Sequence, residues 1–190
     1  MMKTVCLTVV VVFSHLMLQA QENKTLELGL GSISNFYPIK HKDKVYEGTG
    51  IGSGLRIGYE QDLKQLSTGK LTLGGIMVIG SSRANYALGN WKSEYQWRHT
   101  VLAARLAYQY PYDEKLDLYG GLHFGVQFER FRQVYSVSPP ASYTVNNYNH
   151  GAPYTGLFFG AGYKLSKNIG AFAELGYDLM WFTLGAKVYL

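Results

Sequence analysis

The chain has 190 residues, enough for one domain of ordinary size, and it contains a single cysteine, Cys6, so no intrachain disulfide can form. Only 16% of the residues are charged, against about 25% in a typical soluble domain, whereas 22 glycines and 15% aromatic residues are typical of an all-β protein. The formal net charge of +5 is a mild excess with no basic helix to carry it, which argues against a nucleic-acid partner.

The first twenty residues have the organisation of a secretory signal peptide. A short basic start, Met1–Lys3, precedes an apolar run from Val5 to Leu18, and Ala20 places a small residue directly before polar sequence. The run is too short for a spanning helix and no stop-transfer pattern follows it, so a retained membrane anchor is the weaker interpretation. We expect residues 1–20 to be removed, which leaves a single mature domain of residues 21–190.

Apolar and polar residues alternate along much of the mature chain, which predicts β-strands because successive side chains of a strand point to opposite faces. The clearest case is Leu116–Glu129, where a leucine- and phenylalanine-rich face alternates with a polar one. This segment exceeds the usual strand of about 5–6 residues and suffices for the roughly 9–11 residues of a strand that crosses a bilayer. The predicted strands, in chain order, are 25–34, 51–60, 70–80, 97–110, 116–129, 154–165, 169–177 and 182–190.

The connections between these strands alternate in length. Three polar segments, 35–50, 81–95 and 130–153, are predicted to be long loops, whereas the intervening connections are short turns. Short turns at one rim and long loops at the other are typical of bacterial outer-membrane barrels. The sequence therefore predicts an all-β, eight-stranded antiparallel up-and-down transmembrane β-barrel with long extracellular loops and short periplasmic turns. Both termini are then expected at the periplasmic rim.

We expect the apolar face to meet lipid. The opposite face is rich in Gly, Ala and Thr, which suit the narrow interior of an eight-stranded barrel. Aromatic residues near strand ends on the apolar face fit the girdles found at the headgroup level: Tyr59, Tyr108, Tyr110, Tyr163, Tyr177 and Phe182. A secreted, soluble lipocalin-like binding barrel, with the apolar face inward, is the alternative. Charges of both signs share the inferred interior face and predict a network that fills it: Glu27, Arg56, Glu60, Lys70, Arg105, Asp117, Glu174 and Lys187.

The last strand carries a polar-x-Gly-x-x-hydrophobic-x-hydrophobic pattern, formed by Thr183, Gly185, Val188 and Leu190. It is similar to the terminal signal read by the barrel-insertion machinery, although Leu190 stands where Phe is most common. With the stretches 170–177 and 116–121, it resembles small outer-membrane β-barrel proteins of the OmpX/OmpA-like, "porin family" group. The resemblance implies a monomer in the Gram-negative outer membrane, surrounded by lipid and lipopolysaccharide. It also implies barrel-assembly machinery and periplasmic chaperones as partners in biogenesis. It does not assign a function, because that group is functionally mixed.

No motif in the chain predicts a cofactor or a metal. Glycines at 48, 50, 52 and 54 follow the strand period and not a nucleotide-binding spacing. His41 and Asp43 are two potential ligands in one predicted loop, which falls short of a metal site.

The alternative function is an enzyme that acylates or deacylates lipid A, which needs a nucleophile and a base near the outer rim. The residues to test are His41, Ser81, Ser82, Glu94, His99 and His150. His99 is not followed by the His-x-Ser-Asn pattern of the deacylase family, and neither Ser81 nor Ser82 has the adjacent Asp of the palmitoyltransferase family. We therefore predict no catalytic residue, and a structural or surface-interaction role for a barrel whose lumen is plugged by side chains. Basic residues of the predicted loops are candidates for contact with lipopolysaccharide phosphates: Lys40, Lys42, Lys44, Arg130 and Arg132.

Overall fold

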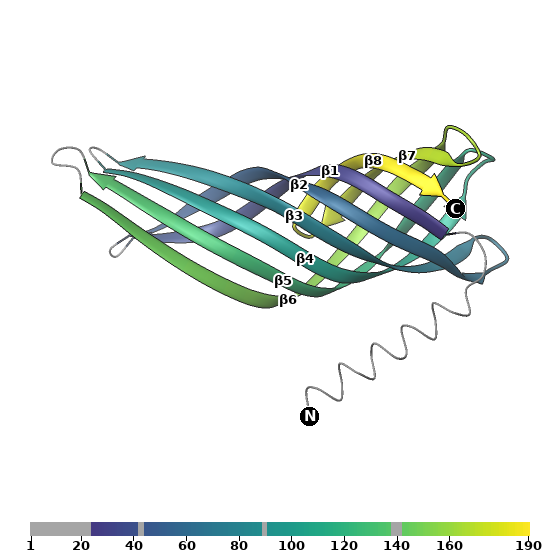
Figure 1. Ribbon diagram of the computed structural model, residues 1–190, viewed down its shortest axis with the longest axis horizontal. Helices are drawn as coiled ribbons and strands as arrows, with labels where there is room; N and C mark the ends of the chain where they lie inside the picture. Colours follow the sequence, from purple (N-terminus) through teal and green to yellow (C-terminus); the bar gives the residue numbers. More distant parts are fainter. Residues whose placement is uncertain (1–23, 42–43, 89–90, 138–141) are drawn as a thin grey trace, which may run out of the picture.

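The computed structural model describes residues 24–41, 44–88, 91–137 and 142–190, with side chains described for 24–33, 51–85, 94–134 and 147–190. Consecutive strands pair antiparallel and the last pairs with the first, so the sheet closes into a barrel (Figure 1). The predicted eight-stranded up-and-down fold is confirmed. The strands are β1 (Lys24–His41), β2 (Lys44–Gln65), β3 (Lys70–Leu88), β4 (Trp91–Pro111), β5 (Leu116–Val137), β6 (Ser142–Lys164), β7 (Ile169–Tyr177) and β8 (Met180–Tyr189).

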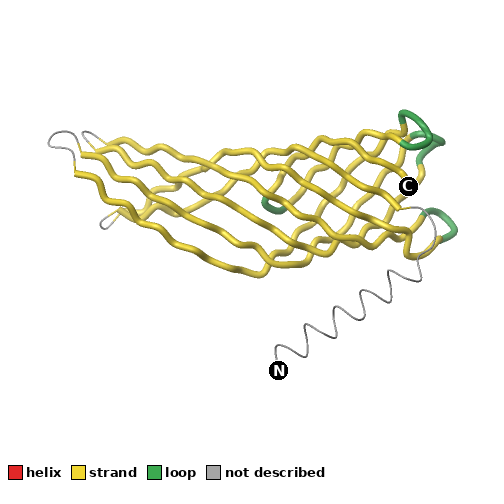
Figure 2. The backbone as a smooth tube through the Cα atoms, viewed as in Figure 1, coloured by secondary structure: helices red, strands yellow, loops and turns green. Residues whose placement is uncertain are grey.

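The predicted long loops are wrong in their length, because most of their residues continue the strands. The β5–β6 ladder runs on to Val137 opposite Ser142, and the β3–β4 ladder to Leu88 opposite Trp91. The resulting hairpins project from one end of the barrel, at the left of Figures 1 and 2. Alternation of polarity reports a buried or lipid-facing surface, whereas a hydrogen-bonded ladder whose outward face meets water needs no apolar residues on that face. For that reason the polar parts of these strands read as loops.

The short turns and both described chain ends lie at the opposite end, at the right of Figure 2. In the β2–β3 turn, Leu66 N–H donates to the carbonyl of Gly69 over 2.8 Å, and in the β6–β7 turn Leu165 N–H donates to Ile169 over 2.9 Å. Leu190 N–H donates to the carbonyl of Lys24 over 2.8 Å, which ties the two chain ends together. No helix in the described part of the chain is long and apolar enough to span a bilayer.

One side of the barrel wall, formed by β7 and β8, is shorter than the rest. β6 pairs with β7 only between Leu157 and Lys164, and β1 pairs with β8 only between Thr25 and Ile33. The connection between β7 and β8 therefore lies near the middle of the molecule, far from the hairpin tips (Figure 2). A bulge between Ser32 and Ile33 marks the point at which β1 leaves β8.

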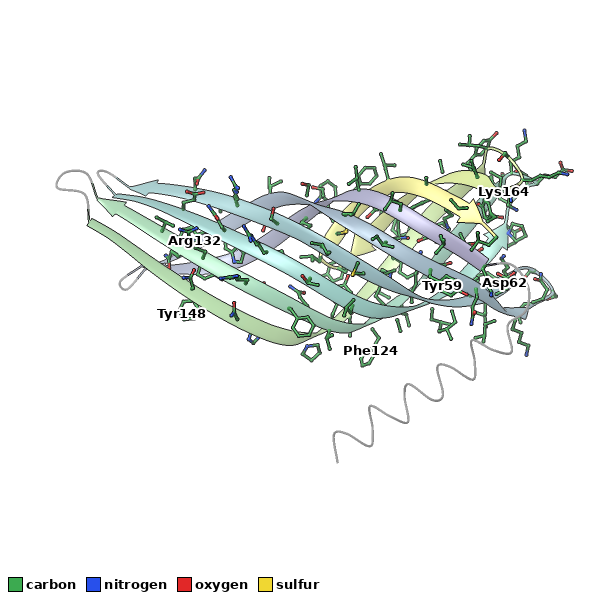
Figure 3. The ribbon with its side chains drawn as sticks, in the orientation of Figure 1. Tyr59, Asp62, Phe124, Arg132, Tyr148 and Lys164 are labelled. Atoms are coloured by element: carbon green, nitrogen blue, oxygen red, sulfur yellow. The ribbon has the colours of Figure 1, made fainter. Side chains whose placement is uncertain are left out.

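The outer surface is apolar and the interior is polar, which is the reverse of a lipocalin. Leu122 is 51% and Phe124 70% exposed, and Phe124 points away from the barrel (Figure 3). The outward residues of β5 from Leu116 to Phe128 form a band about 30 Å tall, from about 3.3 Å per residue and a tilt of roughly 40°. An uninterrupted apolar surface of this kind needs lipid and not water beside it, so the lipocalin-like alternative is wrong.

Candidate functional site: the barrel interior and its two rims

Six buried charges form one continuous chain of ion pairs across the barrel interior. Its order is Lys187 (β8), Glu27 (β1), Arg56 (β2), Glu174 (β7), Arg105 (β4) and Glu60 (β2). Lys187 Nζ lies 2.8 Å from Glu27, and Arg105 Nη2 lies 2.7 Å from Glu174; the remaining contacts are direct as well. Signs alternate along the chain, so every buried charge has an opposite neighbour, which a low-dielectric interior requires.

Aromatic rings flank the cations of this chain. The Arg105 guanidinium lies 3.5 Å from the ring centroid of Phe158, and Lys187 Nζ lies 4.3 Å from that of Tyr119. Cations placed over aromatic faces are attracted by the ring quadrupole, most strongly when both are desolvated. The Tyr119 ring needs Gly160 opposite it, because a Cβ at that glycine would lie 2.7 Å from the phenol. The interior glycines thus give the aromatic rings and the long charged side chains their space.

His123 extends the chain toward the β7–β8 connection. Its Nε2 lies 2.9 Å from Arg105 Nη1, and its Nδ1 lies 2.8 Å from Asp178 Oδ2. Because a guanidinium can only donate, Nε2 must accept and Nδ1 must carry the proton given to Asp178. The second oxygen of Asp178 accepts the N–H of Met180 over 2.9 Å. This arrangement fixes a neutral imidazole and attaches the β7–β8 connection to the barrel interior.

The register of the last hairpin decides which charge Lys187 meets. If β7 and β8 were joined symmetrically about residues 178–181, Glu174 and Lys187 would lie nearly opposite each other. In the structure Glu174 is opposite Thr183, and Lys187 is opposite Gly170 on β7 and Glu27 on β1. Lys187 consequently pairs with Glu27. The β7–β8 connection is shorter than residues 178–181, because β8 already begins at Met180. This shifts the ladder, so that Glu174 and Lys187 are not opposite each other.

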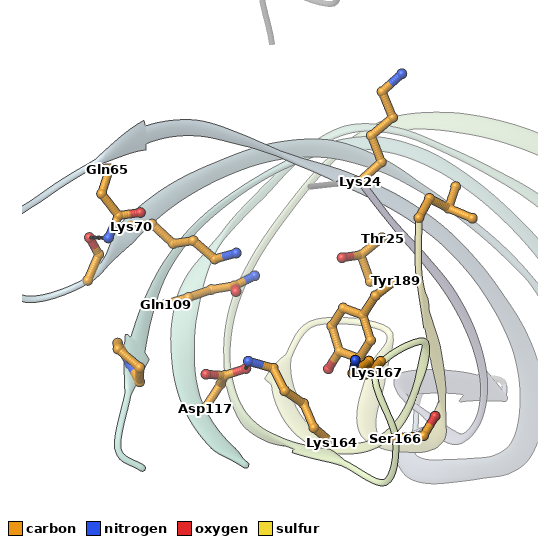
Figure 4. A pocket seen from close by; sticks show the side chains of 13 residues that line it. Lys24, Thr25, Gln65, Lys70, Gln109, Asp117, Lys164, Ser166, Lys167 and Tyr189 are labelled. Carbon is orange, nitrogen blue, oxygen red and sulfur yellow. Dashed lines mark hydrogen bonds and ion pairs between the residues drawn. The ribbon is translucent and has the colours of Figure 1, made fainter. Parts of the chain in front are cut away.

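Two predicted network members, Lys70 and Asp117, lie apart from the central chain, at the short-turn rim. Lys70 Nζ is 2.7 Å from Asp62, and Asp117 is 3.7 Å from Lys164 Nζ. Figure 4 shows both beside a hollow of about 410 Å³ at this end of the barrel. The lining includes the lysines Lys24, Lys70, Lys164 and Lys167, together with Gln109, Asp117 and Tyr189.

Toward the hairpin end, the interior becomes apolar before it becomes polar again. Along β4 the inward residues after Arg105 are Ala103 and Val101, followed by His99 and Trp97, and all are buried. The apolar layer brings together residues of five strands and the β7–β8 connection: Ile33, Ile76, Val78, Val101, Ala103, Tyr154, Leu179 and Met180. Beyond it, Trp97 stacks with Tyr95 at a centroid distance of 6.0 Å.

Those residues considered for catalysis whose side chains the structure describes do not form an accessible site. Ser82 and His99 both face inward on neighbouring strands, and His99 Nδ1 lies 3.5 Å from Glu129. Ser82 and His99 are each only 1% exposed, so a lipid substrate has no path to them. Ser81 and His150 are exposed and Glu94 accepts a hydrogen bond from Gln96, whereas the side chain of His41 lies outside the described residues. The described residues contain no group of three or more His, Cys, Asp or Glu placed to hold a metal, and Asp43 lies outside them.

The predicted lipopolysaccharide contacts separate into two sets. Arg130 and Arg132 are not in a loop but on β5, where both side chains are exposed on the outward face. Figure 3 shows Arg132 in the projecting hairpins, together with Tyr148. Lys40 and Lys44 belong to β1 and β2, but their side chains, and the whole of Lys42, lie outside the described residues.

The residues of the predicted insertion signal occupy both faces of β8. Thr183 and Gly185 face the interior, where Thr183 is buried, whereas Val188 and Leu190 are exposed on the outside. This two-face distribution follows directly from the strand period.

Sequence reasoning missed several members of the site. Asp178 falls between the predicted strands 169–177 and 182–190, and nothing in its sequence neighbourhood indicates that it faces His123. Gln109 and Thr72 both donate to Glu60, over 3.0 and 3.3 Å. Their inward parity was a usable signal, since Gln109 lies four residues from Arg105 on the same strand face.

No protein-family model matches the sequence, and no curated protein sequence matches it. Among solved structures, the chain is similar to Ail, the attachment invasion locus protein of Yersinia pestis, with 14% identity, 88% of this chain and 98% of that chain covered, and a TM-score of 0.49. Neisserial surface protein A shares 11% identity, with 87% and 96% covered and a TM-score of 0.45. A de novo designed transmembrane β-barrel shares 13% identity, with 88% and 95% covered and a TM-score of 0.46. The likeness is one of fold.

The closed ring of eight antiparallel strands, apolar outside and charged inside, defines the class of this protein. It has the fold of small outer-membrane β-barrels, which the strand topology and the two faces of the sheet establish.

Proposed function

We propose that this protein resides in the bacterial outer membrane and acts in surface interaction, not in catalysis. The observation that supports this most is the outward surface of β4, β5 and β6. Its apolar residues stop at a common level, where Thr100, Phe128 and Gly151 are register partners, and the paired strands continue beyond it as a polar wall. The apolar band is the surface that contacts lipid. The polar wall beyond it is the part that a partner outside the cell can reach.

The proposed orientation places the short turns and the described chain ends in the periplasm and the hairpins outside the cell. Residues 1–20 then direct secretion and are removed, and the Thr183–Leu190 pattern serves the barrel-assembly machinery, with periplasmic chaperones acting before it. The surrounding partners are outer-membrane lipids and lipopolysaccharide, and we expect the barrel to be a monomer.

We further propose that the interior is closed to ions. The ion-pair chain from Lys187 to Glu60 and the apolar layer around Val101 lie one above the other along the barrel. Eight strands leave an interior that side chains of this size can fill. The protein is therefore a scaffold for its outer wall and not a pore.

Cell fractionation together with a heat-modifiability gel tests the location. The protein should appear in the outer-membrane fraction, and the unboiled folded form should migrate faster than the boiled form. Recovery in the soluble periplasmic fraction would contradict the proposal. Mass analysis of lipid A from a deletion strain tests the absence of catalysis: an altered acylation pattern, restored by the wild-type gene, would contradict it.

A further inference from the structure

The outward face of the projecting wall carries arginines at the level where the apolar band ends. Arg98 on β4 is directly opposite Arg130 on β5, and Arg132 follows two residues later on the same face of β5. All three side chains are exposed. Opposite residues on one sheet face have Cβ atoms about 4.5–5.5 Å apart, and like charges at that separation destabilise a strand pair. An anion held between them removes this cost.

The carboxylates of the described residues do not supply that anion. The ion pairs found there engage other cations, and Glu129, which borders the same surface, has its carboxylate 3.5 Å from His99 on the inner face. Glu94, two residues beyond Gln96 on β4, accepts the amide of Gln96 over 2.7 Å. The three guanidinium groups are thus left to a ligand from outside the described chain.

Two adjoining hollows share Arg98 and Arg130. One, of about 240 Å³, is lined by Gln96, Arg98, Arg130, Arg132 and Asn147. The other, of about 490 Å³, extends toward the apolar band and includes Thr100, Phe128 and Gly151. The surface therefore passes without interruption from a cationic hollow to a lipid-facing aromatic side chain.

We propose that Arg98, Arg130 and Arg132 form a binding site for a phosphate group of an outer-leaflet glycolipid. Guanidinium groups match phosphate geometry with paired hydrogen bonds, and three of them suit its double negative charge. The Gln96 and Asn147 amides are placed to bind the sugar that bears the phosphate. Phe128 lies where the acyl chains of the same molecule begin, which favours a lipid over a soluble anion. The proposal rests on the proposed outer-membrane location and names the partner of its outer wall.

The test uses the full mature protein folded in detergent micelles, with binding measured by native mass spectrometry. The probes are a bisphosphorylated diglucosamine lipid, the same lipid after phosphatase treatment, inorganic phosphate, and a sulfated polysaccharide. We expect the phosphorylated lipid to bind and its dephosphorylated form to bind roughly tenfold more weakly, because charge-assisted hydrogen bonds are lost.

The variants Arg98→Gln, Arg130→Gln and Arg132→Gln should each weaken binding of the phosphorylated lipid several-fold, and the triple variant should abolish discrimination between the two lipid forms. Arg83→Gln is the matched control. Arg83 is an exposed arginine on the outward face of β3, opposite Gln96, and it lines neither hollow. It should leave binding within about twofold.

Equal binding of both lipid forms, or wild-type affinity in the triple variant, would overturn the proposal. So would inorganic phosphate or the sulfated polysaccharide binding as tightly as the lipid with the same arginine dependence, because the site would then serve a soluble anion. Heat-modifiability of each variant shows that it is folded. A protein that binds the lipid in micelles but fractionates as soluble in cells would contradict the proposed location and leave the arginine site standing.

Discussion

At the scale of single residues, Glu27 shows how the interior is held together. Its two carboxylate oxygens bind different cations, Arg56 from the neighbouring strand β2 and Lys187 from β8 on the other side. Glu27 thereby connects the first strand to both of its neighbours, including the pair that closes the barrel. A buried carboxylate that loses one of two cations keeps its desolvation cost, so the network responds more strongly to the loss of one partner than to the removal of a whole pair.

The first prediction concerns this pair. Lys187→Met should lower the free energy of unfolding by about 3–5 kcal/mol, because a buried ion pair is broken and one charge remains. The double variant Glu27→Gln/Lys187→Met should lose less than the sum of the two single variants. Urea titration of the folded barrel in detergent measures all three. The coupling energy should exceed that of the corresponding Glu174–Lys187 cycle, since those residues are not opposite each other. If the stability losses of the Glu27 and Lys187 single variants were additive in the double variant, the two residues would not form an energetically coupled pair.

The second prediction tests the two faces of β5 with adjacent residues. Leu122→Arg places a cation in the apolar band and should destabilise the inserted barrel by about 2–4 kcal/mol. His123 is 3% exposed, and a glutamine there can still accept from Arg105 and donate to Asp178, so His123→Gln should cost less. Asn85→Arg, on the outward face beyond the band, is the positional control and should change stability little. The membrane-inserted fraction measures the effect; a larger loss for His123→Gln than for Leu122→Arg would reverse the faces.

At the scale of elements, the turns and hairpins differ in what determines them. The β4–β5 turn is set locally: both Lys115 N–H and Leu116 N–H donate to Asp113 Oδ1 over 2.7 Å. The outer hairpins, in contrast, are extended ladders with a polar outward face, so they depend on the strands that emerge from the membrane to align them. Changes in these two kinds of element should therefore have different consequences.

The third prediction is the pH dependence of the Asp113 turn. The two backbone N–H donors hold the pKa of Asp113 below its ordinary value of 3.8, because they favour the carboxylate. A group whose pKa is depressed by folding contributes stability above its unfolded pKa and loses that contribution as the pH falls through the folded value. Asp113→Asn should therefore destabilise the barrel at neutral pH, and the difference from wild type should shrink below about pH 4. Glu114→Gln is the control in the same turn. A difference that grows in acid would contradict the assignment.

The fourth prediction separates the outer wall from the barrel. Replacing residues 132–147 with Asn-Gly removes one hairpin end at the register pair Arg132 and Asn147 and leaves Phe131 opposite Tyr148. Asn-Gly is favoured in two-residue hairpin turns. The shortened protein should still insert and remain heat-modifiable. Removing the same number of residues from inside the band, 120–127 with 152–159, keeps the β5–β6 register but displaces both strands against β4 and β7, and it should prevent stable insertion. Equal failure of the two deletions would show that the wall is needed to form the barrel.

At the scale of the whole molecule, the barrel is organised in layers along its axis. A hollow at the short-turn rim, the ion-pair chain, the apolar layer and the aromatic pair Tyr95 and Trp97 follow one another from one end to the other. On the outside, a single apolar band surrounds the charged and apolar layers alike. The lipid-facing surface is uniform, whereas the interior changes its chemistry with depth.

The fifth prediction is that this layered interior carries no steady ion current. Purified protein in a planar bilayer should show no stable openings, because the side chains of the ion-pair chain and the apolar layer occupy the space that sixteen-stranded porins leave to water. A porin recorded in the same bilayer is the positive control. Frequent, long-lived openings of porin size would contradict a closed lumen. Openings that appear only in Arg105→Ser would instead support the role of that residue in filling the interior.

The sequence alone determined which residues of the membrane strands face inward and which face lipid. The alternation along Leu116–Glu129 places Leu122 and His123 on opposite faces, as the structure has them, because side-chain direction follows the local period of the strand. The eight strands and their antiparallel order were accessible for the same reason: alternation and turn length are both properties of neighbouring residues.

Only the tertiary structure decided which of the inward charges meet. Lys187 pairs with Glu27 across the closing strands, His123 bridges Arg105 and Asp178, and Arg98 stands opposite Arg130, none of which a strand reveals by itself. The length of the outer hairpins was also hidden, since their outward face meets water and carries polar residues that read as loop. Partners across a sheet depend on register, and register in a closed barrel is set by the stagger of all eight strands together.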